Sequence, residues 1–229
     1  MIGSETTASS IFSYLSTVAN WEGSSGFLHR LSQHLGYSGL TLGIAIVVAL
    51  PLGLLTGHTR RGGIPLTLIS NASRSLPTLG LLIIFAIVIG VGLEAAIIPL
   101  LLLAIPPILG NTDLGIRSVD GTVVDAAYGM GMTPLAVLVR VEVPLALPLI
   151  ILGLRTAALQ VVATATIAAY VGLGGLGRYI IDGEANANFT ELGAGAVVVA
   201  CFAIVTEGLF QLAQRLIVSP GVRQHARSE

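Results

Sequence analysis

Residues able to carry catalytic chemistry are few in this chain, and their types exclude several classes of enzyme. All 11 basic residues are arginine, so no lysine is present to form a Schiff base or to hold phosphates in the P-loop of an ATPase. The single cysteine, Cys201, excludes an internal disulfide and a cysteine-rich metal site. The four histidines are scattered and suggest no metal site; they are His29, His34, His58 and His225. The chain therefore cannot itself be a Walker-type ATPase.

The composition is that of a membrane protein. Apolar residues make up 54 % of the 229 residues and charged residues only 10 %, with a mean hydropathy of +0.89, whereas soluble domains are about 25 % charged. A soluble fold of this size would expose much of that apolar surface to water and aggregate. The net charge of −1 creates no global field to attract nucleic acid. We therefore expect an all-α protein embedded in a lipid bilayer.

Five long stretches are candidates for transmembrane helices, which need about 18 or more mostly apolar residues. They are residues 38–57, 75–93, 95–112, about 143–171 and about 192–214. The third is short, and we expect it to be broken at Pro99 and at Pro106-Pro107. Arg155 interrupts the fourth stretch and Glu207 the fifth.

The arginines indicate the orientation of these spans, because translocation disfavours positively charged loops. If the loop after the first span lies inside, most arginines are inside; these are Arg60, Arg61, Arg74, Arg117, Arg140, Arg215, Arg223 and Arg227. Only Arg30 and Arg178 are then outside. We expect the N-terminus outside and the C-terminus in the cytoplasm. Residues 1–37 would form an extracytoplasmic segment, residues 38–214 the transmembrane domain and residues 215–229 a cytoplasmic tail.

The first segment is expected to begin with a short amphipathic helix in the outer interface of the bilayer. Ile11, Phe12, Leu15 and Val18 recur at helical spacing, and Trp21 follows as an interfacial anchor. The alternative is a partly disordered tail, as is common at chain ends.

The longest interior segment, about 112–142, has the residue pattern of two short helices. Thr122 and Asp125 have the spacing of a capping box that starts the first helix, and Gly131 is placed as a left-handed cap after its end. The pair Thr133-Pro134 has the types preferred at the start of the second helix. The result is a small, rigid, partly apolar helix–turn–helix. It docks into a groove of a cytosolic partner, or it packs under its own helices.

The same segment resembles the EAA motif of permease subunits of bacterial ABC importers. That motif reads E-A-A, three residues, G, nine residues, I-x-L-P, and each fixed position has a counterpart here. The counterparts are Asp125, Ala126, Ala127, Gly131, Val141, Val143 and Pro144. Three of them depart conservatively from the motif, with Asp for Glu and Val for Ile and for Leu. The resemblance implies that Asp125, Ala126, Ala127, Gly131, Val141 and Pro144 couple the chain to an ATPase.

Further runs resemble one subgroup, the permeases of importers for osmoprotectants such as glycine betaine, carnitine and choline. The runs are Leu76-Pro-Thr-Leu79, Ile108-Leu-Gly-Asn-Thr112, Gly129-Met-Gly-Met-Thr133, Val143-Pro-Leu-Ala-Leu-Pro148 and Gly174-Gly-Leu-Gly177. The resemblance covers roughly residues 35–220. It implies the type I ABC importer (MetI-like) fold in a multi-pass protein of the bacterial cell membrane.

The resemblance also implies the partners of an ATP-driven transport subunit. Two permease subunits, identical or different, form the pathway, and an extracytoplasmic binding protein delivers the substrate. Two separate ATP-binding cassette subunits bind ATP and Mg²⁺ and dock on the EAA segments, so this chain would hold no cofactor and would not be an enzyme. Aromatic residues are only 5 % of the chain, which is poor material for an aromatic cage around a quaternary ammonium. Tight capture is therefore assigned to a partner.

Other functions stay open at this point. One alternative is an ABC importer permease for a different small molecule, such as an amino acid or a polyamine. Another is a stand-alone secondary carrier or channel. The sequence has no evident internal repeat, which argues against a secondary carrier. A scaffold that transports nothing would have no use for the coupling motif. Arg155, which is costly inside a span, is a gate or pathway residue with Glu207, or is neutralised by pairing with it.

Three further features each have two interpretations. The run 172–177 has the glycine spacing of a dinucleotide-binding fingerprint but follows a membrane span rather than a strand. It is interpreted as structural punctuation, a turn between elements, or as a place where a partner can approach closely. Asp182, Glu184 and Glu191 steer a cationic ligand or form a merely solvated acidic loop. Two pairs have the spacing of small-residue helix packing, inside the chain or at a dimer face: Gly39 with Gly43, and Gly53 with Gly57.

Overall fold

A computed structural model describes residues 4–61 and 75–218 of the chain. Arg74, Arg223, Arg227 and most of the tail expected from residue 215 lie outside the described residues. Helices and turns, without a strand, make up the described ranges. The elements in chain order are α1 (Ser4–Ser16), η1 (Val18–Asn20), α2 (Phe27–Thr59), α4 (Thr78–Ile89), α5 (Leu93–Arg117), α6 (Gly121–Gly129), α7 (Pro134–Val137), η2 (Leu138–Glu142), α8 (Val143–Ile167), η3 (Ala168–Val171), α9 (Gly177–Ala185) and α10 (Phe189–Ile217).

Four helical stretches are long and apolar enough to cross a membrane: α2, α5, the stretch 134–171 that contains α8, and α10. The expected second span holds only the 12-residue α4, which rises about 18 Å against a hydrocarbon core of about 30 Å. Gly90 and Gly92 follow it with φ of +113° and +135°, conformations that glycine alone adopts readily. The described residues therefore hold four full-length candidates and α4 as a shorter apolar helix, and a fifth crossing at this position stays a prediction.

The helix α5 is continuous through all three of its prolines, contrary to the expected break. Proline is tolerated in membrane helices because neighbouring groups satisfy the carbonyls that it frees. Half of the apolar window of α5 is buried, whereas none of that of α10 is, so lipid or another subunit must cover α10. Because α5 extends to Arg117, the interior loop expected from residue 112 begins only at Ser118.

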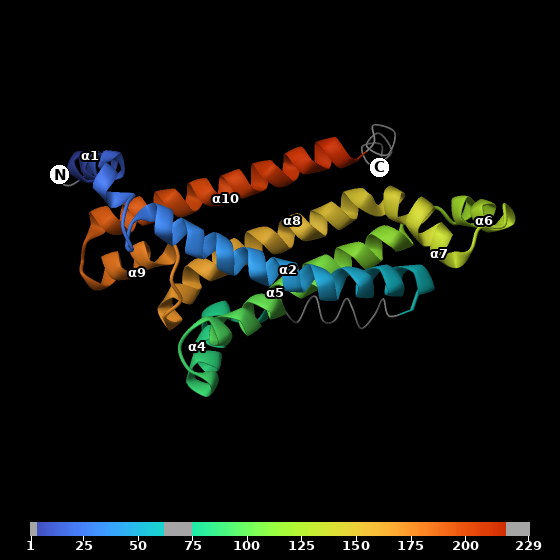
Figure 1. Cartoon of the computed structure of the whole chain (residues 1–229), viewed down its shortest axis with the longest axis horizontal. Coiled ribbons are helices and arrows are strands. Elements are labelled where there is room, and N and C mark those ends of the chain that lie inside the picture. The colour runs from blue at the N-terminus through green and yellow to red at the C-terminus, as the bar shows by residue number, and fades with distance from the viewer. Residues whose placement is uncertain (1–3, 62–74, 219–229) are drawn as a thin grey trace. The chain divides into compact units, whose positions relative to one another are not determined.

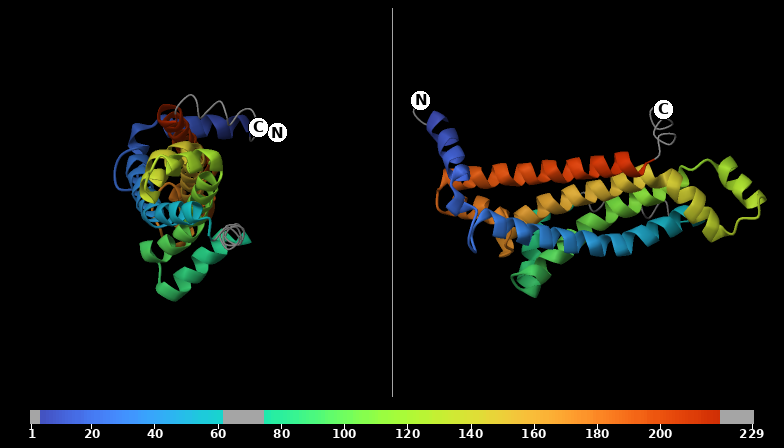
Figure 2. Two further views of the ribbon diagram at one scale, coloured as in Figure 1. Left: turned by 90° about the vertical axis from the view of Figure 1, so that its right-hand side faces the viewer. Right: turned by 45° about the horizontal axis from the view of Figure 1, so that its top comes forward.

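The described residues divide into two compact units. Unit 1 holds residues 4–41, 76–101 and 159–206, and unit 2 holds residues 42–61, 75, 102–158 and 207–218. The spanning helices α2, α5, α8 and α10 supply residues to both units. Within unit 2, α6 and α7 lie beyond the ends of α2 and α5 in both Figure 1 and Figure 2.

An aromatic cluster in unit 1 holds the N-terminal segment in place. Phe27 is fully buried, stacks on Tyr179 with ring centroids 4.0 Å apart, and contacts Trp21 at 5.1 Å. The Trp21 indole donates to Leu15 O at 2.7 Å, and the Tyr179 hydroxyl donates to Ser25 O at 2.6 Å. Burial raises the pKa of Tyr179 to about 12. These rings therefore pack against one another.

The expected amphipathic helix exists as α1, but its packed face differs from the expected one. Ile11, Tyr14 and Leu15 pack into the aromatic cluster, whereas Phe12 and Val18 are 75 % and 67 % exposed. For Val18 the reason is that the chain leaves the α-helix before this residue and continues as a 3₁₀ turn, which changes the angular spacing of the side chains.

The glycine run 172–177 forms a turn that packs against Gln33 of α2. Gly172 and Gly175 have φ of +81° and +91°, and the Gly175 N–H donates to Gln33 Oε1 at 3.0 Å. A side chain at Gly174 would overlap the Gln33 amide. The interpretation of the run as backbone punctuation is confirmed, and close approach of a partner is untested.

In unit 2, the C-terminal half of α2 packs closely on α5. A Cβ built on Gly53 would lie 2.7 Å from the Thr112 Cβ, and one on Gly57 would lie 2.6 Å from the Ile116 Cβ, distances that real side chains do not adopt. This glycine pair therefore serves packing inside the chain. Gly39 and Gly43 face open space, with no atom within 4 Å of an added Cβ.

Candidate functional site

Residues 118–142, here called the connecting segment, join α5 to α8. Its first helix, α6, begins two residues earlier than the Thr122 cap predicts. Asp120 is the N-cap, and its Oδ1 accepts from the Thr122 N–H at 2.8 Å and from the Thr122 hydroxyl at 2.9 Å. These two hydrogen bonds lower the pKa of the exposed Asp120 carboxyl. The predicted capping box between Thr122 and Asp125 was wrong, because an Asp two residues upstream already satisfies the first turn.

The end of α6 has the geometry that Gly131 predicts. Gly131 has φ of +82°, its N–H donates to Tyr128 O at 2.9 Å, and the Met132 N–H donates to Ala127 O at 3.2 Å. These two bonds form a Schellman motif, whose left-handed residue is usually glycine. The prediction of a left-handed glycine after this helix is confirmed.

The second helix begins as predicted at the Thr133-Pro134 pair. The Thr133 hydroxyl oxygen accepts from the Ala136 N–H at 3.3 Å, and Pro134 occupies the first helical position. The helix α7 then passes through one π-helical turn, η2, directly into α8. Single π turns inside α-helices are frequent at functional sites, and this one ends at Glu142.

The predicted coupling residues occupy two different environments. Asp125, Ala126, Gly131 and Pro144 are exposed, Val141 is half-buried, and Ala127 is 2 % exposed. The connecting segment also exposes large apolar side chains; they are Val123, Tyr128, Met130, Leu135 and Val139. The segment therefore has exposed apolar side chains as well as a packed face, and its docking on a partner stays a prediction.

Two residues of this site were missed in the sequence. Glu142, only 3 % exposed, accepts a hydrogen bond from Nδ1 of His58 at 2.5 Å. His58 lies in the last turn of α2, and Glu142 is the last residue of η2. A lone acid that leads into a long apolar run, as at Glu142, implies a buried partner. That signal was present, but the sequence offered no way to choose His58 among the histidines.

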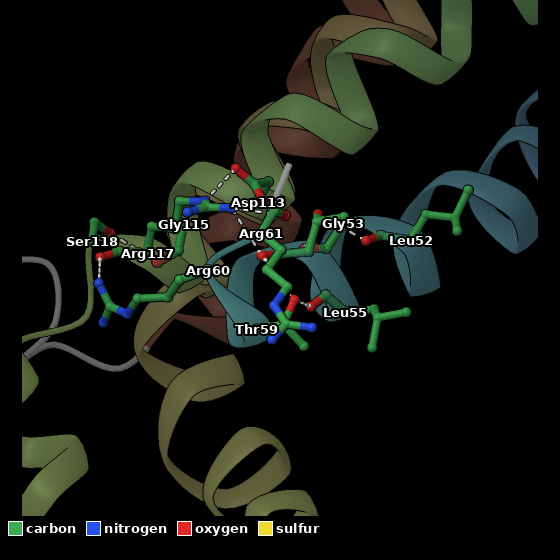
Figure 3. A network of polar contacts seen from close by, with 11 residues as sticks. Leu52, Gly53, Leu55, Thr59, Arg60, Arg61, Asp113, Gly115, Arg117 and Ser118 are labelled. Carbon is green, nitrogen blue, oxygen red and sulfur yellow. Dashed lines mark hydrogen bonds and ion pairs between the residues drawn. The ribbon is translucent and has the colours of Figure 1, made fainter. Parts of the chain in front are cut away.

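The guanidinium of Arg117, the last residue of α5, forms hydrogen bonds with its own helix and with the end of α2 (Figure 3). Its Nε donates to Asp113 Oδ2 at 2.7 Å, and one terminal nitrogen donates to Thr56 O at 2.9 Å and to Arg61 O at 3.1 Å. The two carbonyls belong to the last turn of α2 and to the second residue beyond its end. Such carbonyls lack partners inside their own helix and attract cations.

Arg155 and Glu207 lie together, as predicted from the sequence. The Arg155 Nε donates to Glu207 Oε2 at 2.6 Å, and a second hydrogen bond joins the same two side chains. The Gln211 amide also donates to Glu207 at 2.7 Å. The paired state of Arg155 is confirmed, and a gate or pathway role for the two residues is untested.

The acidic residues at and near α9 each have a local partner. Asp182 accepts from Arg178 Nε at 3.2 Å, Glu184 from the Tyr170 hydroxyl at 2.6 Å, and Glu191 from the Asn188 amide at 3.1 Å. Within residues 4–61 and 75–218, no three His, Cys, Asp or Glu side chains are grouped so as to hold a metal ion.

Comparison with known proteins identifies the family. Residues 49–223 match the family described as "Binding-protein-dependent transport system inner membrane component". The chain is 34 % identical over 197 residues to the choline transport system permease protein OpuBB of Bacillus subtilis, covering 86 % of this chain and 91 % of that one. It is 32 % identical to the osmoprotectant import permease protein OsmW of Salmonella typhimurium, with 86 % and 95 % covered.

The fold is similar to that of a solved ABC transporter. A chain of the MetNI methionine ABC transporter in an inward-facing conformation aligns with a TM-score of 0.73 at 23 % identity, over 84 % of this chain and 96 % of that one. The all-helical MetI-like fold, the apolar spans and the family match agree with one another. This chain is a multi-pass membrane protein and belongs to the family of binding-protein-dependent transport system inner membrane components.

Proposed function

We propose that this chain is the permease subunit of an ATP-driven importer for a quaternary amine or related compatible solute, of the choline, glycine betaine and carnitine type. The observation that carries the proposal is the similarity, at about one-third identity and over most of both chains, to permeases named for choline, carnitine and osmoprotectants.

In this proposal the connecting segment is the contact with a separate ATP-binding cassette subunit. Asp125 and Ala126 are exposed on α6, and Gly131 shapes the turn into α7. The exposed apolar side chains Met130 and Leu135 would be buried by the partner, which is favourable in proportion to the apolar area removed from water. ATP and Mg²⁺ would be bound in the partner chain, and this chain would hold no cofactor.

We further propose that the arginine-rich ends of the spans face the cytoplasm. Unit 2 holds Arg60, Arg61, Arg117, Arg140 and Arg215, whereas unit 1 holds Arg30 and Arg178. Cytoplasmic segments carry the excess of arginine in membrane proteins. This orientation puts the connecting segment on the side where ATP is available, with residues 1–37 outside and residues 215–229 inside.

The remaining partners follow from the same proposal. A second permease subunit, identical or homologous, would complete the pathway, and two cassette subunits would dock on the pair. An extracytoplasmic binding protein would capture the substrate, because Tyr14, Trp21, Phe27 and Tyr179 are packed against one another in unit 1. An aromatic cage for a quaternary ammonium needs open ring faces.

Co-purification followed by reconstitution tests the proposal. The tagged chain is expressed with its genomic neighbours, extracted in mild detergent, and its bound proteins are identified. We expect a cassette ATPase in equal amount, and ATP-dependent uptake of labelled choline, glycine betaine or carnitine into proteoliposomes. ATP-driven uptake of an amino acid or polyamine instead would overturn the substrate class. A stable protein without an ATPase, driven by gradients alone, would overturn the importer.

A further inference from the structure

The last turn of α2 is bonded to the C-terminal end of the connecting segment and to the last residue of α5, which directly precedes the segment. At the C-terminal end of the segment, His58 Nδ1 donates to the buried Glu142 carboxylate at 2.5 Å. At the N-terminal end, Arg117 stands immediately before Ser118 and donates to the α2 carbonyl Thr56 O at 2.9 Å. Both contacts lie within unit 2.

Other features of this end of α2 reinforce its attachment. Arg117 also donates to Arg61 O at 3.1 Å (Figure 3). Arg60 has φ of +54°, a left-handed conformation that strains a residue with a Cβ and persists only where surrounding contacts hold it. Gly57 brings the α2 backbone close to Ile116 and Asp113 of α5. Movement of the connecting segment without this turn would break several of these contacts.

The Glu142 contact is the more informative of the two. A carboxylate that is 3 % exposed loses its hydration, and losing its one charged or hydrogen-bonding partner is strongly unfavourable. Glu142 lies at the junction of the π turn with α8, so its position is coupled to that of the whole α7–α8 connection. The hydrogen bond thus ties α2 to the point where the segment enters the next span.

We propose that His58 and Glu142 are positioning residues that transmit movement of the connecting segment to α2. In this arrangement α2 moves with the segment as a third helix, in addition to α5 and α8, which continue from it covalently. The inference rests on the proposed function, since it assumes that an ATPase docks on the connecting segment.

The test compares ATP hydrolysis stimulated by the binding protein with basal hydrolysis, in the reconstituted complex. His58→Leu combined with Glu142→Leu replaces the buried pair by apolar side chains, which restores stability in many proteins. We expect this double variant to assemble with the ATPase while its stimulation falls about tenfold, within the range of typical coupling energies. His58→Asn keeps a donor at the position of Nδ1 and should retain most of the stimulation.

Thr59→Val is the matched control, because within the part of the chain that the structure describes the Thr59 hydroxyl bonds to carbonyls of its own helix alone, Leu55 O and Thr56 O. Full stimulation in the double-leucine variant, equal to that of Thr59→Val, would overturn the inference and leave the proposed function standing. If the double-leucine variant does not assemble, His58→Asn is compared with Glu142→Gln instead. Equal loss of stimulation in these two variants would also overturn the inference. Failure of the unmodified chain to bind an ATPase would instead overturn the proposed function.

Discussion

The guanidinium of Arg155 forms two hydrogen bonds with the carboxylate of Glu207, although 52 residues separate them in the chain. The two side chains come from α8 and α10, both apolar enough to span a membrane. Each charge alone would be costly at that depth, and pairing reduces the cost of both. Because α10 buries none of its apolar window, this ion pair is a specific link between α10 and α8 within unit 2.

We predict energetic coupling between these two residues. Arg155→Leu or Glu207→Leu alone should lower the midpoint of thermal unfolding in detergent or nanodiscs, because each leaves a charge without its partner. The double variant should recover part of the loss, so that its effect is smaller than the sum of the two single effects. Exactly additive single effects in this double-mutant cycle would show that the pair contributes nothing specific. Loss of uptake with normal stability in all three variants would point to a pathway role.

Gly131 should control coupling without controlling insertion. Its φ of +82° means that Gly131→Val adds about 1–2 kcal/mol of backbone strain to the turn between α6 and α7. We expect normal amounts of the variant in the membrane but hydrolysis that the binding protein no longer stimulates. Gly129→Ala is the control, since Gly129 is helical and an added Cβ has no atom within 4 Å. Normal stimulation in Gly131→Val would remove the coupling assignment of this turn.

The glycines of α2 should respond to alanine with opposite signs. Gly57→Ala places a Cβ 2.6 Å from the Ile116 Cβ, and overpacking of this kind costs about 1–3 kcal/mol of unfolding free energy. Gly43→Ala meets open space and should stabilise by about 0.5–1 kcal/mol through helix propensity. Thermal unfolding of the two variants in the same detergent measures the difference. Equal stabilisation by both would contradict the close packing of α2 on α5.

Much of the connecting segment was predictable because its signals are local. The left-handed Gly131 and the cap at Thr133 depend on backbone conformation within a few residues, and both were predicted correctly. The start of α6 was not, because Asp120 and Thr122 compete for the same cap and the letters do not rank them. The prolines of α5 misled for a related reason, since a membrane environment tolerates them where water would not.

The apolar, charge-poor spans, the absence of lysine chemistry and the spacing of the coupling motif were all readable from residue types, because each depends on residue type and local order alone. Pairing between distant residues could be predicted only where a charge lies inside an apolar span. Arg155 suggested a partner because a charge in an apolar span demands one, and Glu207 was the available acid. The contact of His58 with Glu142, by contrast, depends on where the last turn of α2 meets the π turn before α8. A position of that kind follows from helix packing, in which Gly53 and Gly57 permit close approach to α5, and no spacing along the chain encodes it.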